Sequence, residues 1–97
     1  MIARIIESAE ADLQRAFDYY EQIRRGLGQE LMDEFRRGLN EIIVNPNAWQ
    51  KLDRLHRRYR LSRFPYGIIY QSSDTEVLVI SLTHLHRKPG SWRRRVK

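Results

Sequence analysis

The stretch RYRLSRFPYGIIYQSSDTEVLVISLTH, residues 58–84, decides the fold of this chain. It holds three runs rich in β-branched and aromatic residues, which predict strands over residues 58–64, 67–72 and 76–84. The links between the runs are short, so the strands are expected to pair as antiparallel neighbours. The last run is apolar at both strand parities. It is therefore expected to be a central strand covered on both faces, or to line a groove that takes a partner.

The residues before this stretch show one short strand pattern and two helical patterns. Residues 1–7 are rich in isoleucine and predict a strand that joins the sheet at an edge. Ser8 is the expected N-cap of a first helix, which ends in the glycine-rich turn of residues 26–28. A second helix is predicted over residues 29–44 and ends just before Pro46.

The element order predicts an α+β fold with residues 1–97 in a single domain. We expect an N-terminal strand, an antiparallel helical hairpin, and then a three-stranded antiparallel sheet with a short basic C-terminal tail. The hairpin is expected to pack on one face of the sheet. The side chains expected in the deep core are Phe17, Leu39, Ile69 and Ile80, and those expected to anchor the connector of residues 46–57 are Trp49, Leu52 and Leu55.

Positive charge is concentrated in the second half of the chain. Residues 1–50 carry six basic and nine acidic side chains, whereas residues 51–97 carry twelve basic and three acidic ones. The net charges of the two halves are therefore −3 and +9, which sum to the +6 of the whole chain. Such a surface attracts polyanions, namely nucleic acid, an acidic protein segment or an anionic membrane. The alternative is a solvated surface that only aids solubility.

Composition also excludes several classes of protein. The chain has no cysteine, so it has neither a disulfide framework nor a zinc–thiolate site. No apolar run approaches the ~18–20 residues that span a bilayer, and no signal-peptide pattern opens the chain. The expected location is the cytoplasm, with no contact to a membrane, and no cofactor is expected.

Three arginines near the start of the opening stretch are candidates to bind an anion. A guanidinium stays protonated and offers a planar fork of donors, so it can hold a phosphate or carboxylate but cannot act as a base. Arg58 and Arg60 share one face of the predicted strand, where a solvated face is the alternative to a site. Arg63 has the opposite parity, and twist or a bulge at the strand end would let it reach either side.

His84, at the end of the last predicted strand, is the candidate acid or base, because the unperturbed pKa of histidine lies near neutrality. The alternative for His84 is a structural hydrogen bond at the strand end. His86 has the same parity, but a metal site normally has three or four protein ligands, so no metal is expected. His56 stands alone in the connector and is expected at the surface.

Aromatic and basic side chains complete the candidate set. Tyr66 and Tyr70 could present hydroxyls to a phosphate, although a sheet tyrosine more often packs in the core with a wet tip. Trp92 is expected to fold back on the sheet, with stacking on a nucleobase as the alternative. Residues 93–97 form a basic tail. The side chains expected to contact a target or partner are Arg58, Arg60, Arg63, Tyr70, Arg87, Trp92, Arg93 and Arg94.

The chain resembles the ParE/RelE superfamily of toxins from type II toxin–antitoxin modules, in particular its ParE-like, plasmid stabilisation branch. The more specific matches are RLSRFPYGIIY, residues 60–70, and THLHRKPGSW, residues 83–92. The segments SAEADLQRAFDYYEQIRRGLG, residues 8–28, and LNEIIVNP, residues 39–46, extend the similarity over nearly the whole chain. The resemblance implies a cognate antitoxin whose acidic or amphipathic C-terminal segment wraps the toxin and blocks it.

The resemblance implies two possible targets. ParE-type members poison DNA gyrase, whereas RelE-type members cleave mRNA in the ribosome with basic residues, often with a tyrosine or histidine. Carried over by position, the catalytic candidates for mRNA cleavage are His84, Arg63 and Arg87, but no tyrosine follows His84. Poisoning of DNA gyrase is therefore the favoured expectation. A ribosome-dependent endoribonuclease and an inactive toxin that retains only antitoxin binding are the alternatives.

Overall fold

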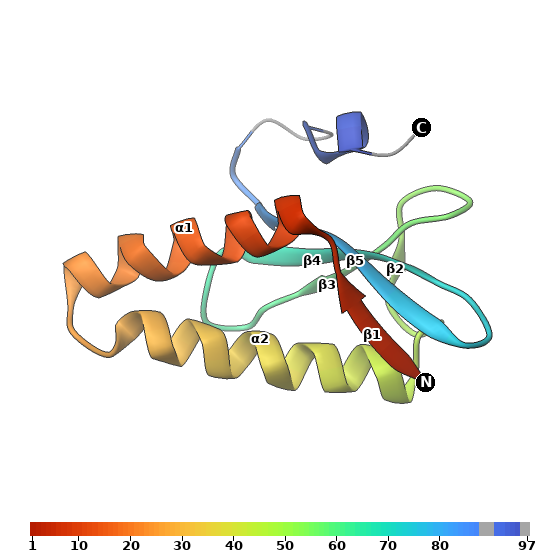
Figure 1. Cartoon of the computed structure of the whole chain (residues 1–97), viewed down its shortest axis with the longest axis horizontal. Coiled ribbons are helices and arrows are strands. Elements are labelled where there is room, and N and C mark those ends of the chain that lie inside the picture. The colour runs from red at the N-terminus through yellow and green to blue at the C-terminus, as the bar shows by residue number, and fades with distance from the viewer. Residues whose placement is uncertain (88–90, 96–97) are drawn as a thin grey trace.

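The computed structural model describes residues 1–87 and 91–95. Figure 1 shows two helices side by side along a sheet, with a short C-terminal helix beyond the start of the first one. The elements are β1 (Ile2–Ile5), α1 (Glu7–Ile23), α2 (Leu27–Val44), β2 (Gln50–Lys51), β3 (Arg57–Arg60), β4 (Tyr66–Ser72), β5 (Glu76–His84) and the 3₁₀ helix η1 (Ser91–Arg95). The predicted α+β layout with a helical hairpin is confirmed. None of the helices described is long and apolar enough to cross a bilayer.

The sheet has five strands in the order β1-β5-β4-β3-β2. The strands β3, β4 and β5 pair in antiparallel fashion as predicted, and β1 lies at an edge as predicted. However, β1 runs parallel to β5, and β2 adds a two-residue strand beside β3. The expected three-stranded antiparallel sheet is therefore corrected to a five-stranded mixed sheet. The helical hairpin between β1 and the later strands gives the chain the length that a parallel pairing needs.

Both helices begin earlier than predicted. The N-cap of α1 is Ile6 rather than Ser8, and α2 begins at Leu27, two residues before its predicted start. Gly26 precedes α2 with φ of +90°, a left-handed conformation that suits glycine. The carboxylate of Glu21 accepts backbone N–H hydrogen bonds from this turn at 3.0 and 2.7 Å. A side chain of α1 thus satisfies donors at the start of α2 that have no partner within the helix.

The strand predicted over residues 58–64 is shorter in the structure, where β3 ends at Arg60. The chain then turns away from the sheet towards α2, where Glu34 is only 5% exposed. The Glu34 carboxylate accepts hydrogen bonds from the backbone N–H and the hydroxyl of Ser62 and from the backbone N–H of Arg63. These bonds hold the loop between β3 and β4 against the helical hairpin.

The core has one part on each face of the sheet. Leu31 and Ile42 of the hairpin pack with Ile68 and Val79 on one face. On the other face the buried side chains of Ile69, Ile80 and Trp92 form a smaller cluster. The apolar residues at both parities of β5 are therefore explained by a central strand covered on both sides, as predicted.

The core predictions hold only in part. Ile69 and Ile80 are each 1% exposed and confirm the expectation. Phe17 and Leu39 are half-buried, so their expected deep burial is corrected. Leu55 is 64% exposed and does not anchor the connector.

Candidate functional site

A hollow of about 300 Å³ opens between the sheet and η1 and gathers five of the predicted site residues. We call it the arginine hollow. Its wall on the sheet side comes from β3, β4 and β5, and its other wall comes from η1. None of the described residues that line it is acidic. The lining residues are Leu52, Arg58, Ile69, Thr83, His84, Leu85, Arg87, Trp92 and Arg93.

Arg58 crosses the sheet face from β3. It stands opposite Ile69, and its aliphatic stem lies over Gly67, where an added Cβ would come within 2.9 Å of the Arg58 Cγ and Cδ. One terminal nitrogen donates a hydrogen bond to the Gln50 side chain at 2.8 Å, but the buried Nε has no acceptor among the described residues. Burial lowers the pKa of Arg58, and repulsion from Arg60 adds to this effect. Arg58 is therefore a cation in the hollow whose Nε–H has no acceptor among the described residues.

His84 presents a proton donor rather than a base. The backbone N–H of His86 donates a hydrogen bond to His84 Nδ1 at 3.1 Å, so the proton of the neutral ring sits on Nε2. Burial, Arg87 and His86 all lower the pKa of His84, which keeps the ring neutral at physiological pH. A structural hydrogen bond was the alternative role predicted for His84. This bond is present, and its donor is the backbone N–H of His86. The ring also meets Tyr66 edge-on, with centroids 5.1 Å apart.

Arg87 lies in the turn after β5, beyond Leu85 and His86, and is exposed. Its backbone N–H donates to the carbonyl of His84 at 3.2 Å, which fixes the turn on which it sits. Arg87 lines both the arginine hollow and a smaller neighbouring hollow of about 180 Å³, which also includes Asp12 and Tyr66. His84 and Arg87 are therefore brought together as the sequence predicted.

Trp92 and Arg93 form the η1 wall of the hollow. Trp92 is 4% exposed and packs on the sheet, which confirms that it folds back. The Arg93 guanidinium lies 4.4 Å from the centroid of the Trp92 ring and donates to Asp53 at 2.6 Å. With so little of its ring exposed, Trp92 is poorly placed to stack on a nucleobase. Its role in the structure is to support the position of Arg93.

His56 is buried behind this wall, at 4% exposure, so its expected place at the surface is corrected. The Gln71 amide donates to His56 Nε2 at 3.0 Å, so Nδ1 carries the proton and donates to Asp53 at 2.9 Å. The His56 ring lies 4.7 Å from that of Trp92. Hydrogen bonds from Arg93 and from the backbone of Leu55, with that from His56, hold the pKa of Asp53 well below its usual range. Asp53 is thus a fixed anion that ties the connector to η1.

Four predicted site residues lie outside the arginine hollow. Arg63 pairs with Glu30 of α2 and is not brought together with His84 and Arg87. Tyr70 is fully buried, its hydroxyl donates to the Pro46 carbonyl at 2.6 Å, and burial raises the pKa of Tyr70 to about 12. Tyr70 is therefore a core residue that no partner can reach. The remaining two, Arg60 and Arg94, are exposed and do not line the hollow.

An ion pair that the sequence did not reveal fastens η1 to α1. Asp12 accepts two hydrogen bonds from the Arg95 guanidinium, at 2.6 and 2.9 Å. It also accepts bonds from the Ser81 hydroxyl and from the backbone N–H of Leu82, both at 3.1 Å. Arg95 makes a further bond to the carbonyl of Ile80 at 3.1 Å. In the sequence, Asp12 is one acid among several in a helix and Arg95 one of three consecutive arginines, so no local pattern marks the pair.

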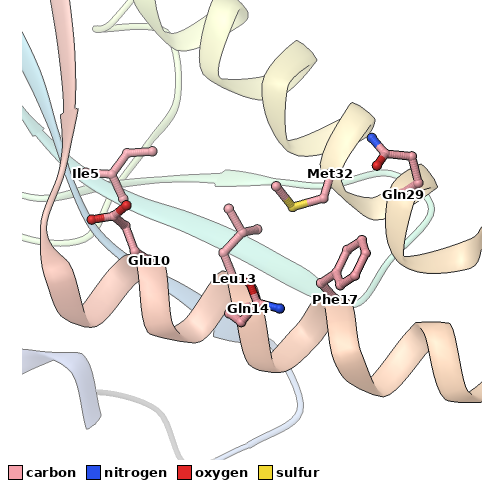
Figure 2. A pocket seen from close by; sticks show the side chains of 7 residues that line it. All are labelled: Ile5, Glu10, Leu13, Gln14, Phe17, Gln29 and Met32. Carbon is pink, nitrogen blue, oxygen red and sulfur yellow. The ribbon is translucent and has the colours of Figure 1, made fainter.

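A second groove, of about 330 Å³, lies on the hairpin side of the molecule. Figure 2 shows side chains from β1, α1 and α2 converging on it, among them Ile5, Leu13, Phe17 and Met32. The position of Phe17 on this groove explains why it is only half-buried. Among the residues described, no group of three or more histidine and carboxylate side chains is arranged to hold a metal ion.

Comparison with known proteins finds a matching sequence family and a solved structure with a similar fold. The family model described as "ParE toxin of type II toxin-antitoxin system, parDE" matches residues 4–89. A solved structure titled "Chromosomal ParDE TA system from P. aeruginosa" is similar with a TM-score of 0.77 and 16% sequence identity, covering 89% of this chain and 97% of that chain. No curated protein is similar enough to the chain to count as a match. At 16% identity the structural likeness speaks for the fold, whereas the family match covers both the hairpin and the strands of the arginine hollow.

Proposed function

Because the chain belongs to the ParE toxin family of type II toxin–antitoxin systems, we propose that it arrests growth by poisoning DNA gyrase and that a cognate antitoxin neutralises it. The observation that carries the choice of target is the arginine hollow. It offers fixed cations and hydrogen-bond donors, but among its described residues no group is set up to accept a proton. Such a site suits binding rather than bond cleavage.

Cleavage of RNA would need more than this hollow provides. A proton must leave the attacking 2′-hydroxyl, and another must reach the leaving oxygen. The Nδ1 lone pair of His84 is already occupied by a backbone N–H, and its Nε2 carries a proton. Burial raises the pKa of Tyr66, so its phenol stays protonated at neutral pH. In this arrangement His84 is therefore not positioned as a general base, and none of the described residues that line the hollow is a carboxylate.

The alternative function is a ribosome-dependent endoribonuclease. It draws support from the edge-on contact of His84 with Tyr66 and from Arg87 next to both. In that case the protonated imidazolium form of His84 would have to serve as the acid, although the lowered pKa of His84 disfavours this form. The base would have to come from outside the described residues. We rank this function second for that reason.

The proposed antitoxin covers the basic face of the sheet. The excess of basic side chains in residues 51–97 favours an acidic or amphipathic C-terminal segment, whose carboxylates would pair with the arginines. Hydrogen exchange of the purified complex tests this placement. Protection should appear on β3, β5 and η1, and protection confined to the outer surface of α1 and α2 would contradict it.

Expression of the chain without its antitoxin separates the two targets. We expect gyrase-linked DNA breaks and little ribosome-associated mRNA cleavage. A His84→Gln variant, whose amide can replace the Nε2–H donor, should remain toxic if it folds. Codon-phased mRNA cuts that vanish in His84→Gln would overturn the gyrase proposal. Antitoxin binding without any growth arrest would point to an inactive toxin.

A further inference from the structure

The arginines described in this chain fall into two groups. Seven of the fifteen, Arg63, Arg93 and Arg95 included, have a carboxylate within 4.0 Å. The other eight have none among the described residues, and of these eight only Arg58 and Arg87 line the arginine hollow. Their charges are therefore not neutralised by a partner in the described fold. Arg93 adds a third guanidinium at the rim, although Asp53 offsets its charge.

The hollow also presents donors that lack acceptors. The buried Nε of Arg58 has no hydrogen-bond partner among the described residues. The Nε2–H of His84 follows from the bond that its Nδ1 accepts, and no acceptor for it is found in the described part of the chain. A buried donor without an acceptor lowers stability. Such an arrangement is readily explained if the missing acceptor belongs to a ligand.

Size and chemistry point to a phosphate with an organic group attached. The volume of about 300 Å³ is at the lower end of the ~300–1,000 Å³ of small-molecule sites. The apolar side chains of Leu52 and Leu85 line part of it. A phosphate offers more acceptor oxygens and, as a monoester, more charge than a single carboxylate, and arginine forks match it in a bidentate way.

We propose that the arginine hollow binds the phosphate group of a nucleotide or of a nucleic-acid strand, with Arg58 and Arg87 as the main ligands and His84 Nε2–H as a neutral donor. This inference goes beyond the proposed target and does not depend on it. An antitoxin that covers the basic face would compete with this ligand.

Binding of defined probes to the purified full chain tests the proposal. The probes are inorganic phosphate, a deoxymononucleotide, a short single-stranded oligodeoxynucleotide and a glutamate-rich peptide. Nuclear magnetic resonance should show shifts at the Arg58 Nε–H and at the His84 ring with a phosphate-bearing probe. Mononucleotide binding equal to that of the oligonucleotide identifies a free nucleotide as the source, whereas binding of the oligonucleotide alone identifies a strand.

Matched variants separate this site from general attraction. Arg58→Gln and Arg87→Gln should each weaken binding of the phosphate-bearing probe by ~10-fold or more, as expected for a lost charge-assisted hydrogen bond. Arg60→Gln and Arg94→Gln remove the same charge outside the hollow and should change binding less than ~3-fold. Equal losses in all four variants would overturn the proposal, and so would binding of the acidic peptide alone.

Folding of each variant is checked by its thermal midpoint. Arg87 is exposed, so Arg87→Gln keeps the test decisive even if Arg58→Gln, whose stem packs over Gly67, unfolds. If the wild-type chain binds no phosphate-bearing probe but still causes gyrase-linked breaks, this inference alone is rejected. Retained phosphate binding without such breaks would reject only the proposed target.

Discussion

Two partly buried arginines flank the same cluster on the sheet, and their surroundings differ. Arg95 directs its donors to Asp12 and to the carbonyl of Ile80, and the hydrogen bond to Asp12 raises the pKa of Arg95. Arg58 has a buried Nε without an acceptor, and burial lowers its pKa. The difference indicates that Arg95 serves the fold, because it closes a network. Arg58 instead has a buried Nε–H donor that a bound ligand could satisfy.

The largest expected effect is on the Arg95 side of this comparison. Asp12→Ala would remove the carboxylate that pairs with Arg95 and that accepts from the Leu82 N–H. Of its described bonds, Arg95 would keep only the one to the Ile80 carbonyl. The free energy of unfolding should therefore fall by about 3–5 kcal/mol. Urea unfolding at neutral pH measures the loss. The surface variant Asp33→Ala should stay within about 0.5 kcal/mol of the wild type. A loss below about 1 kcal/mol in Asp12→Ala would mean that the network does not hold η1.

A smaller effect compares the two arginines directly. Arg95→Met should lower the free energy of unfolding by about 1.5–3 kcal/mol, because hydrogen bonds between charged groups are lost. Arg58→Met should leave stability unchanged or raise it, because it removes an unsatisfied buried donor while keeping the apolar stem. The two variants are compared in the same urea titration. A greater loss of stability in Arg58→Met than in Arg95→Met would contradict the conclusion that Arg95, rather than Arg58, stabilises the fold.

The smallest expected effect concerns the pH dependence of stability. The pKa of His84 is lowered in the folded protein, so the unfolded chain binds the proton more tightly. The contribution of the neutral His84 ring to the free energy of unfolding is therefore constant above about pH 6.5 and is lost as the pH falls below that value. Acidification from about pH 7.5 to about pH 5.5 should lower the thermal midpoint of the wild type more than that of His84→Gln. Identical shifts in both proteins would show that His84 is not neutralised by its surroundings.

The parts of the fold that follow from local patterns were predicted from the sequence. The apolar stripes of the two helices, the stop before Pro46 and the two short links between the last three strands are each read within a few residues. The sequence also predicted the burial of Trp92, because a large aromatic side chain after the last strand can pack on the apolar face of the sheet. The two-residue β2 is too short to show the alternation that marks a strand.

The residues that could not be predicted depend on contacts between distant segments. The sequence pattern leaves His56 isolated in the connector, because its partner Gln71 comes from β4 and its neighbour Trp92 from η1. Arg63 looked equally able to reach either face, and only the position of Glu30 on α2 decides its direction. Tyr70 shares its parity with the core residue Ile68, but the sequence does not show that its hydroxyl reaches the Pro46 carbonyl.

The sequence named five of the residues that line the arginine hollow, but not the hydrogen bonds that set their chemistry. Arg58, His84, Arg87 and Arg93 were expected to act, and the structure places them around one hollow. The tautomer of His84 depends on one backbone hydrogen bond in the turn after β5, which no sequence pattern specifies. That bond is what favours binding over acid–base chemistry.

A cleavage assay with purified DNA gyrase tests whether this chain poisons the enzyme. The chain is added to gyrase and supercoiled plasmid, and the accumulation of linear, gyrase-bound DNA is measured. We expect accumulation with the wild type, with His84→Gln and with Arg60→Gln. With Arg58→Gln we expect at least a ~10-fold weaker effect, because Arg58 lines the hollow and its buried Nε has no acceptor among the described residues. No cleaved DNA with the wild type, together with mRNA cleavage on ribosomes that His84→Gln abolishes, would contradict the gyrase proposal.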